Sequence, residues 1–335
     1  MKIGLQTNLF NAAPKQPLML AYGLGVDSTS VLVELKKRGI RPDAILFADV
    51  GSEKQETYDY LPVINNWLKS VGFPQVIVVK YVPKDFKNWP PYYSLGENCL
   101  TNGTLPSLAF GFKSCSLKWK VTPQNQWTDK WGPARDYWSI GGKVKKIIGY
   151  DASAKDRKRY AQAVGVEDPK YDYWYPLIDW NMDRDACKAS ILAEGLPVPP
   201  KSACFFCPST QPEELFTHKK EYLRYIVAME ARASPRLTHI EGLWRNGVKG
   251  TRGGSKRPGK MTDFIISEGL LPEEEVISIQ INMPADIIRN QELFAAGGEI
   301  PEWHDFLEMY TPEDALDESG ICGSCIMVSK QTLSK

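Results

Sequence analysis

Short apolar runs alternate with amphipathic stretches through the first two thirds of the chain. Apolar runs of roughly four to eight residues are typical of strands that are covered on both faces. Four segments of this kind predict strands, at 18–21, 45–49, 76–79 and 146–148. The first two are each followed by a helix, read from residues 31–37 and from 52–61. Two successive strand–loop–helix units predict a parallel sheet, and such sheets bind ligands at the carboxyl ends of their strands.

The pattern becomes mainly helical from about residue 211 onward, as in residues 220–229. We therefore expect an α/β domain with a parallel sheet over 16–210 and a helical C-terminal region over 211–335. Inside the first domain, residues 82–113 form a long insertion interrupted by Pro and Gly, and we expect it to act as a lid or flap. The C-terminal region contains a basic loop at 245–260 and ends in a tail with a Cys-x-x-Cys pair.

Composition narrows the class of protein. The chain has 335 residues and 43% hydrophobic content, which is ample for a buried core. Lys and Arg number 41 against 40 Asp and Glu, so the net charge of +1 does not indicate a general nucleic-acid binder. No apolar stretch approaches the roughly 18–20 residues of a membrane span, and the N-terminus has no signal-peptide core. We expect a cytoplasmic protein with no membrane contact. The oligomeric state stays open, with a homodimer as one option.

Candidate chemistry begins at the turn between the first strand and its helix, residues 23–28. Its glycines allow a tight turn and a close approach to a ligand. The amides of the turn and of the new helix N-terminus suit an anion such as phosphate. Asp27 is predicted to be the N-cap, and Ser28 and Thr29 add hydroxyl donors. Taken alone, the same residues also fit an ordinary strand–loop–helix turn.

Two segments carry a resemblance to a known family. Gly23–Ser28 resembles the SGGxDS pyrophosphate loop of the PP-loop ATP pyrophosphatases. Phe47 to Tyr58 resembles the FADTGxExPETY segment of the phosphoadenylyl-sulfate (PAPS) reductase branch. The chain departs from these patterns with Gly23 in place of Ser, Leu24 in place of Gly and Gln55 in place of Pro. The resemblance implies a Rossmann-like, adenine nucleotide alpha hydrolase-like fold. Leu24 leaves a degenerate, non-hydrolysing loop as an alternative.

The resemblance also implies a site for ATP. Asp27 or Asp49 would place Mg²⁺. Arg157, in a basic helix start after the strand predicted at 146–148, would contact phosphate, because a guanidinium binds phosphate through two hydrogen bonds. A solvated helix face is the alternative for Arg157. The residues expected to bind the nucleotide are Tyr22, Gly23, Gly25, Asp27, Ser28, Thr29, Phe47, Asp49 and Gly51.

Seven cysteines suggest thiol or metal chemistry rather than a disulfide framework. Cys204 and Cys207 form a Cys-x-x-Cys pair inside a run that resembles the family's YPLxDW…GLPxxP…CxxC pattern. Cys115 lies in a segment that resembles the family's Cys-x-x-(Arg/Lys)-x-Lys-x-x-Pro pattern. The resemblance implies that these three thiolates hold an iron–sulfur cluster, with Cys99 as the fourth ligand of a 4Fe–4S centre. A four-cysteine zinc site needs the same residues and stays open. Cys187, at helical spacing, is expected to be a small buried hydrophobe.

The C-terminal region adds two candidates. Cys322 and Cys325 form a second Cys-x-x-Cys pair, but Ser319 stands where PAPS reductases carry their attacking Cys, and a hydroxyl cannot replace that thiolate. The basic loop 245–260 has two interpretations: it binds the phosphates of a nucleic acid, or it is a solvated surface loop. Trp244 and Trp303 either stack on nucleic-acid bases or pack in the core or an interface of the protein.

The expected function is ATP α,β-cleavage that adenylates an acceptor for thiolation. The resemblance implies a nucleic-acid acceptor, DNA or RNA, and a sulfur-donor protein such as a cysteine desulfurase. Two alternatives remain. One is a PAPS or APS sulfonucleotide reductase that uses the C-terminal thiols. The other is a non-catalytic nucleotide- or nucleic-acid-binding protein with a structural zinc.

Overall fold

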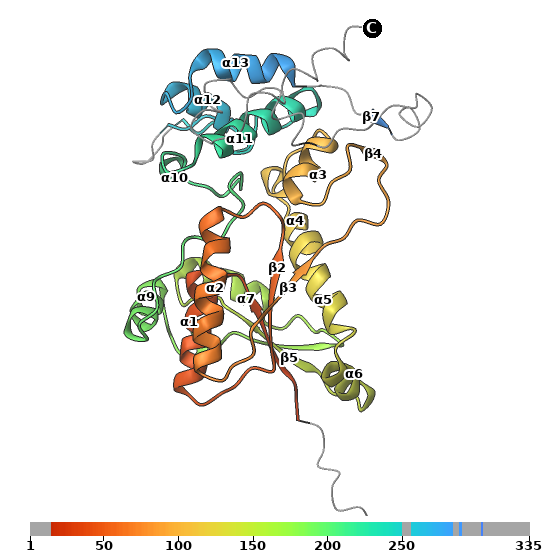
Figure 1. The fold of residues 1–335 in the computed structure, drawn as a ribbon, viewed down its shortest axis with the longest axis vertical. Helices are drawn as coiled ribbons and strands as arrows, with labels where there is room; N and C mark the ends of the chain where they lie inside the picture. The colour runs from red at the N-terminus through yellow and green to blue at the C-terminus, as the bar shows by residue number, and fades with distance from the viewer. Residues whose placement is uncertain (1–14, 250–255, 284–287, 290–302, 304–335) are drawn as a thin grey trace, which may run out of the picture. The chain divides into compact units, whose positions relative to one another are not determined.

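The chain divides into two compact units. The computed structural model describes residues 15–249, 256–283, 288–289 and 303 (Figure 1). The first unit contains the residues up to 49 together with 53–81 and 118–203, and the second contains 50–52, 82–117 and the chain from 204 onward. The insertion predicted at 82–113 therefore belongs to the second unit. None of the described helices has the length and hydropathy that crossing a bilayer requires.

A five-stranded parallel sheet forms the centre of the first unit, in the order β3-β2-β1-β5-β6. This arrangement confirms the predicted α/β class with a Rossmann-like parallel sheet. The four predicted strands are present, and β6 is a fifth that the apolar pattern did not indicate. The strands are β1 (Leu18–Tyr22), β2 (Ala44–Asp49), β3 (Val76–Lys80), β5 (Val144–Ile148) and β6 (Tyr171–Trp174).

Helices cover both faces of this sheet (Figure 1). Neighbouring strand residues point to opposite faces, so Leu20 and Phe47 enter one hydrophobic cluster while Met19 and Leu46 enter another. The first cluster is closed by α1 and α9, which pack together, and by α2. The second is closed by α5 and α6. The helices of the unit are α1 (Val26–Lys37), α2 (Gln55–Ser70), α5 (Thr122–Thr128), α6 (Gly132–Ser139), α7 (Ala154–Ala163), α8 (Pro176–Asp179) and α9 (Arg184–Ala193).

The second unit is built around helix α11, which packs against α3, α12 and α13. Its apolar face buries Leu223, Ile226 and Val227 at helical spacing. A short antiparallel pair, β4 with β7, joins Asn88–Trp89 to Ile288–Arg289. The helices are α3 (Leu95–Thr101), α4 (Ser114–Ser116), α10 (Pro212–Leu215), α11 (Lys220–Ala233), α12 (Met261–Ser267) and α13 (Glu273–Asn282), with 3-10 turns at Ser107–Phe110 and Ser234–Arg236 and a π-turn at Leu117–Val121 that leads into the first unit.

One buried carboxylate organises the region of the basic loop. Glu230, on α11, accepts hydrogen bonds from the amides of Leu243 (2.7 Å), Met261 (3.0 Å) and Thr262 (2.8 Å). The Thr262 hydroxyl also donates to it. Burial raises the pKa of Glu230, and the four donors oppose that rise. Two of the amides belong to the first turn of α12, so the same carboxylate caps that helix and fixes both ends of the loop.

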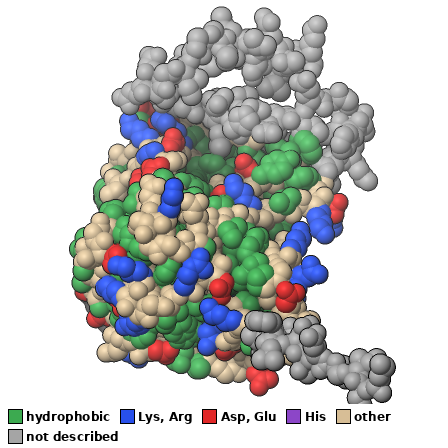
Figure 2. Space-filling view, turned by 60° about the horizontal axis from the view of Figure 1, so that its bottom comes forward, with side chains coloured by type: hydrophobic (Ala, Val, Ile, Leu, Met, Phe, Trp, Pro, Cys, Tyr) green, Lys and Arg blue, Asp and Glu red, His purple; other side chains and the backbone are tan. Residues whose placement is uncertain are grey.

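Charges on the surface are mixed. On the face drawn in Figure 2, Lys and Arg side chains are interspersed with Asp and Glu side chains rather than gathered in one field. This mixture agrees with the net charge of +1. Any attraction of this face for phosphates must therefore be local.

Candidate functional site

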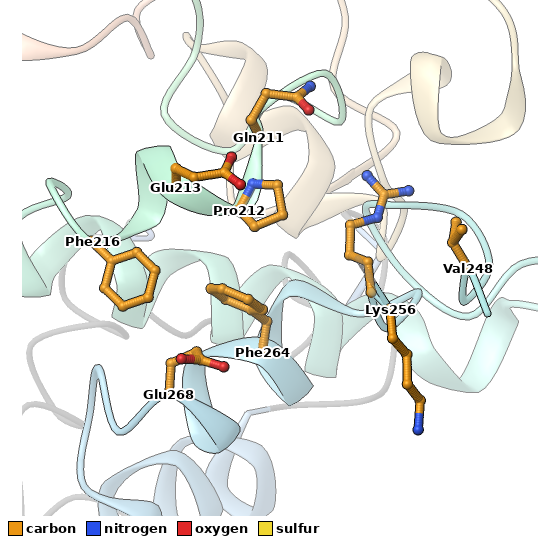
Figure 3. A pocket seen from close by; sticks show the side chains of 9 residues that line it. Gln211, Pro212, Glu213, Phe216, Val248, Lys256, Phe264 and Glu268 are labelled. Atoms are coloured by element: carbon orange, nitrogen blue, oxygen red, sulfur yellow. The ribbon is translucent and has the colours of Figure 1, made fainter. Parts of the chain in front are cut away.

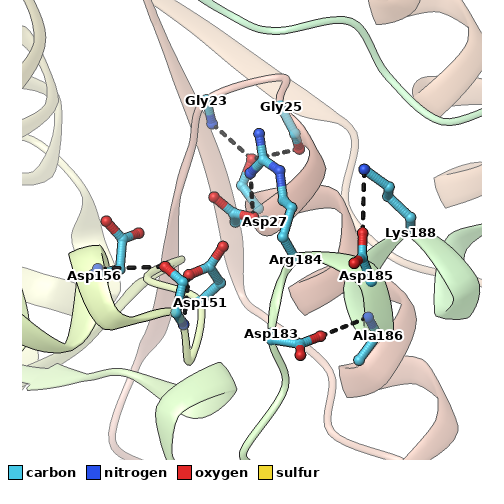
Figure 4. A network of polar contacts seen from close by, with 12 residues as sticks. Gly23, Gly25, Asp27, Asp151, Asp156, Asp183, Arg184, Asp185, Ala186 and Lys188 are labelled. Atoms are coloured by element: carbon cyan, nitrogen blue, oxygen red, sulfur yellow. Dashed lines mark hydrogen bonds and ion pairs between the residues drawn. The ribbon is translucent and has the colours of Figure 1, made fainter. Parts of the chain in front are cut away.

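The turn between β1 and α1 is held by its own polar side chains (Figure 4). The Gly23 amide donates to the Ser28 hydroxyl at 3.2 Å, and that hydroxyl donates to the Gly25 carbonyl at 3.2 Å. The hydroxyl of Ser202 donates to the Gly23 carbonyl from a distant part of the unit. Tyr22 and Thr29 are buried, and their hydroxyls are hydrogen-bonded at 3.0 Å. The turn is thus shaped before any ligand arrives.

The helix that follows begins two residues earlier than the cap prediction implied. Gly25, not Asp27, is the N-cap of α1, and Asp27 lies in the first turn, so that prediction was wrong. Gly149, after β5, lies against the start of the helix: a Cβ there would be 3.1 Å from the Ser28 amide nitrogen. The first amides of a helix have no acceptor within the helix, and its N-terminus favours an anion. The turn can therefore receive a phosphate.

Three carboxylates and one arginine meet beside this turn (Figure 4). Asp27, Asp151 and Asp156 each place one ligand oxygen within 4.8 Å of the others, a grouping suited to a divalent cation. Arg184, at the start of α9, forms an ion pair with Asp27. Burial raises the pKa of Asp27, and the charges of Asp151 and Asp156 add to this effect, while Arg184 opposes it.

The supports of the two partner carboxylates are local. The Ser153 amide donates to Asp151 at 2.9 Å, and Arg159 forms an ion pair with Asp156 at 3.0 Å. Ser153 is also the N-cap of α7, where its hydroxyl accepts from the Asp156 amide. The cap and the ion pair hold both carboxylates beside Asp27.

Asp49 lies in a different set of contacts at the end of β2. Tyr58 donates to one of its carboxylate oxygens at 2.8 Å, and Lys80 pairs with the other at 2.8 Å. The Tyr58 hydroxyl also accepts from the amide of Glu53, whose carboxylate pairs with Lys120 at 2.8 Å. Among the described residues, Asp27 and not Asp49 is the predicted magnesium ligand that lies with other carboxylates.

The remaining predicted nucleotide residues have mainly structural neighbours. Phe47 is buried in the core of the first unit, on the strand that pairs with β1. Gly51 has a φ of +68°, and a Cβ there would be 2.7 Å from the Ser94 side chain. Arg157 donates to the Ala152 carbonyl (2.9 Å) and to the Asn181 side chain (2.6 Å). Its guanidinium thus braces the segment after β5.

Sequence reasoning missed Asp151, Asp156, Arg184 and Ser202. Asp151 follows a predicted strand, as Asp27 and Asp49 do, so its position was a usable signal. Asp156 and Arg184 each follow a helix cap, Ser153 and Asp183. Nothing in the local pattern around Ser202 indicates that its hydroxyl reaches the turn.

The four predicted cysteine ligands all belong to the second unit. Cys204 and Cys207 lie in one turn, closed by a hydrogen bond from the Cys207 amide to the Cys204 carbonyl at 3.0 Å. Cys99 is buried in α3, and the Cys115 amide in α4 donates to the Ser107 hydroxyl at 2.7 Å. The Cys204–Cys207 turn is supported by aromatic packing, since Phe205 stacks on Tyr222 with ring centroids 4.4 Å apart.

The spacing of these thiols bears on the kind of metal they fit. A tetrahedral zinc ion with sulfur ligands holds the sulfurs about 3.8 Å apart. No three thiols among the described residues lie within 4.8 Å of one another. In an iron–sulfur cluster each cysteine binds a different iron, so the sulfurs lie farther apart. The described residues therefore contain no preformed three-cysteine zinc site.

The structure also places the remaining cysteine and tryptophan candidates that fall within the described residues. Cys187 is fully buried in α9, as expected of a small hydrophobe. Trp244 and Trp303 are also buried, which places both in the core rather than on a base-stacking surface. Ser319, Cys322 and Cys325 lie outside the described residues, as does the centre of the basic loop.

No protein-family model matches the chain, and no curated protein matches it.

Proposed function

We propose that this chain is a PP-loop enzyme related to the PAPS reductase family, and that it cleaves ATP between the α- and β-phosphates. The observation that carries the proposal is the grouping of a helix N-terminus, an arginine and three carboxylates at the turn 23–28. Amide dipoles and a guanidinium favour phosphate oxygens. Carboxylates favour the Mg²⁺ that accompanies ATP.

In the proposed reaction, an oxygen of the acceptor attacks the α-phosphorus as the bond to the bridging oxygen breaks. Pyrophosphate leaves with the electron pair, the acceptor becomes adenylated, and its proton passes to solvent. The amides of residues 23–28 and Arg184 hold the leaving pyrophosphate, where charge develops in the transition state. Asp27, with Asp151 and Asp156, would hold Mg²⁺, and Asp49, at the end of β2 in the same unit, would border the ribose and adenine.

The proposed acceptor is a nucleic acid, which adenylation would activate for thiolation. Cys99, Cys115, Cys204 and Cys207 would hold a 4Fe–4S cluster, or three of them would hold one with an open iron. Such a cluster, when bound, supplies an iron site for sulfur. A donor protein such as a cysteine desulfurase would provide that sulfur. The four thiols support this assignment in that all of them belong to the second unit.

The first test concerns the nucleotide. We expect Arg184→Gln to weaken MgATP binding about 10- to 100-fold, because it removes a charge-assisted contact to phosphate. We expect Asp27→Ala to abolish pyrophosphate release. Calorimetric titration and a pyrophosphate assay measure the two effects. Lys188→Gln is the matched control, since this lysine also lies on α9 and pairs with exposed Asp185 instead.

Each outcome of that test has a clear meaning. Unchanged ATP binding in Arg184→Gln would reject the site, and no binding by the unaltered protein would indicate the degenerate loop. A preference for PAPS over ATP would favour the sulfonucleotide reductase.

The second test concerns the cysteines. Protein purified without oxygen should contain iron and sulfide and show the brown absorbance of a cluster. Cys204→Ser should lose both, because it removes a proposed ligand. Cys187→Ala, which alters a buried cysteine of the first unit, should keep them. A colourless protein with stoichiometric zinc would contradict the cluster.

A further inference from the structure

The second unit contains a pocket of about 480 Å³ that uses none of the residues assigned above to the nucleotide or the cluster (Figure 3). It lies where the basic loop begins and ends. Its lining combines aromatic, acidic and basic side chains, namely Gln211, Pro212, Glu213, Phe216, Val248, Lys256, Arg257, Phe264 and Glu268.

One side of the pocket is a supported aromatic surface. Phe216 is 55% exposed, although a large apolar ring is usually covered. It meets Phe264 edge-on with ring centroids 5.9 Å apart, and Phe264 in turn contacts buried Trp244 at 5.5 Å. Figure 3 shows Phe216 and Phe264 on one side of the pocket and Val248 and Lys256 on the other. An exposed ring on a rigid support suits stacking with a planar ligand.

The other side presents a fixed guanidinium. Arg257 lies 5.0 Å above the Trp244 ring, and one of its terminal nitrogens donates to the Trp244 carbonyl at 3.4 Å. Among the described residues, that carbonyl is the one acceptor recorded for its terminal N–H groups, so other terminal donors of this pocket-lining residue are available to a ligand. Burial also lowers the pKa of this arginine. A guanidinium with unused donors gains most from a ligand that brings hydrogen-bond acceptors.

The acidic side chains limit which ligand fits. Glu213 and Glu268 offset Lys256 and Arg257 in charge, so a bare phosphate would meet two carboxylates as well as two cations. An apolar side chain of a protein would fill the space but leave these charges without partners. A fitting ligand is planar, with acceptors on one edge for Arg257 and donors on another for a carboxylate.

Guanine has this pattern. Its O6 and N7 accept from arginine, and its N1–H and N2–H₂ groups donate, while its faces stack on aromatic rings. Adenine lacks the two neighbouring acceptors. The ammonium group of Lys256 extends away from the two phenylalanine rings in Figure 3, so it is separate from the stacking surface and suits a backbone phosphate beside the base.

We infer that this pocket binds an unpaired guanine of a single-stranded nucleic acid. The inference deepens the proposed function and rests on it for the choice of a nucleic acid as the ligand. The contacts themselves come from the second unit alone. With these contacts the protein recognises one base of the proposed acceptor. The basic loop alone would attract its phosphates whatever the base.

The test is calorimetric titration of the full-length protein, at one fixed salt concentration, with thymidine trinucleotides that carry guanine, adenine, cytosine or thymine in the middle. The guanine trinucleotide should bind most tightly. Phe216→Ala should weaken that binding about 5- to 150-fold, because it removes one base-stacking contact. Glu268→Gln and Glu213→Gln together should reduce the preference for guanine over adenine. Phe112→Ala is the control, since Phe112 is also exposed in the second unit, at 68%.

Equal affinity for the four trinucleotides would overturn the assignment to guanine. Equal effects of Phe216→Ala and Phe112→Ala would overturn the assignment to this pocket. Parallel titrations with MgATP separate the two proposals. If the unaltered protein binds the guanine trinucleotide but not MgATP, the result counts against the proposed function. If it binds MgATP but not the trinucleotide, the result counts against the pocket.

Discussion

Leu24 adopts a left-handed backbone conformation, with a φ of +57°, while its side chain is fully buried. Left-handed backbone costs a residue with a Cβ about 1–2 kcal/mol. The packing of the side chain offsets that cost, since Leu24 belongs to the larger core cluster of the first unit. The turn thus keeps the conformation that a glycine would adopt, with an apolar anchor in place of a bare backbone.

This balance predicts an unusual order of stability. Leu24→Gly should lose about 1–4 kcal/mol of unfolding free energy, because the lost packing exceeds the strain relieved. Leu24→Ala should lose roughly 1 kcal/mol more, because it keeps the strain and loses most of the packing. Urea unfolding of the three proteins measures the order. An alanine variant more stable than the glycine variant would show that the backbone at this position is not strained.

The candidate site could be predicted from sequence only in part at this scale. The turn 23–28 follows from its glycines and its place after a strand, and Asp27 is visible within it. Arg184 lies far along the chain, and its contact with Asp27 depends on the packing of α9 against α1. Local patterns do not encode such long-range contacts.

Strand β5 carries two neighbouring lysines with opposite environments. Lys146 is buried, donates to the Asn125 side chain at 3.2 Å and lies 4.8 Å from the Tyr171 ring. Lys145 is 36% exposed and pairs with Asp172 at 3.8 Å. Strand alternation alone explains the difference. Burial lowers the pKa of Lys146 from 10.5 to about 8, with a nearby Asp168 opposing this shift.

The lowered pKa predicts how stability depends on pH. Between about pH 8 and 10.5 the unfolded chain binds more protons at Lys146 than the native chain, so this lysine makes stability rise with pH. Below pH 8 the native protein contains a buried ammonium, at a cost of roughly 3 kcal/mol. Lys146→Met should therefore stabilise the protein at pH 7, by about 1–2 kcal/mol after loss of the Asn125 contact.

The gain from Lys146→Met should shrink as the pH rises from 7 to 9.5, and urea unfolding at both pH values measures it. Lys145→Met is the control and should change stability little at either pH. A gain that does not depend on pH would show that packing, not charge, decides the effect.

Four of the five strands of the parallel sheet follow from the apolar pattern, and the strand that does not has a physical reason. Strand β6, Tyr171–Trp174, has the sequence Tyr-Asp-Tyr-Trp, without the branched aliphatic residues that mark a buried strand. It pairs only with β5 and lies at an edge of the sheet. An edge strand needs less apolar surface, so the sequence contained too little signal to predict it.

At the scale of the whole molecule, the two units are interleaved along the chain. Residues 82–117 belong to the second unit although they interrupt the first. Helix α3, within this insertion, buries Leu95, Cys99 and Leu100 and packs on α11. Sequence reasoning detected the insertion from its Pro and Gly content. Its packing partner lies more than a hundred residues away, beyond the reach of local patterns.

The interleaving predicts which fragments fold. Residues 15–203 alone should aggregate, because α3 would lose its cover. The same fragment with 82–117 replaced by a short Gly-Ser linker should stay soluble and unfold cooperatively. The join is feasible because the rings of Tyr81 and Trp119 lie 4.9 Å apart, so the ends to be joined are neighbours. Circular dichroism and thermal melts of both fragments measure this. Equal solubility and equal melting curves would contradict the division into units.

The carboxylate of Glu230 has a consequence for how the protein can change over evolution. Because it accepts hydrogen bonds from Leu243 on one side of the loop and from Met261 and Thr262 on the other, one side chain holds both ends of the loop. Loss of this carboxylate would release both ends of the loop and the start of α12 together, so we expect position 230 to tolerate few substitutions.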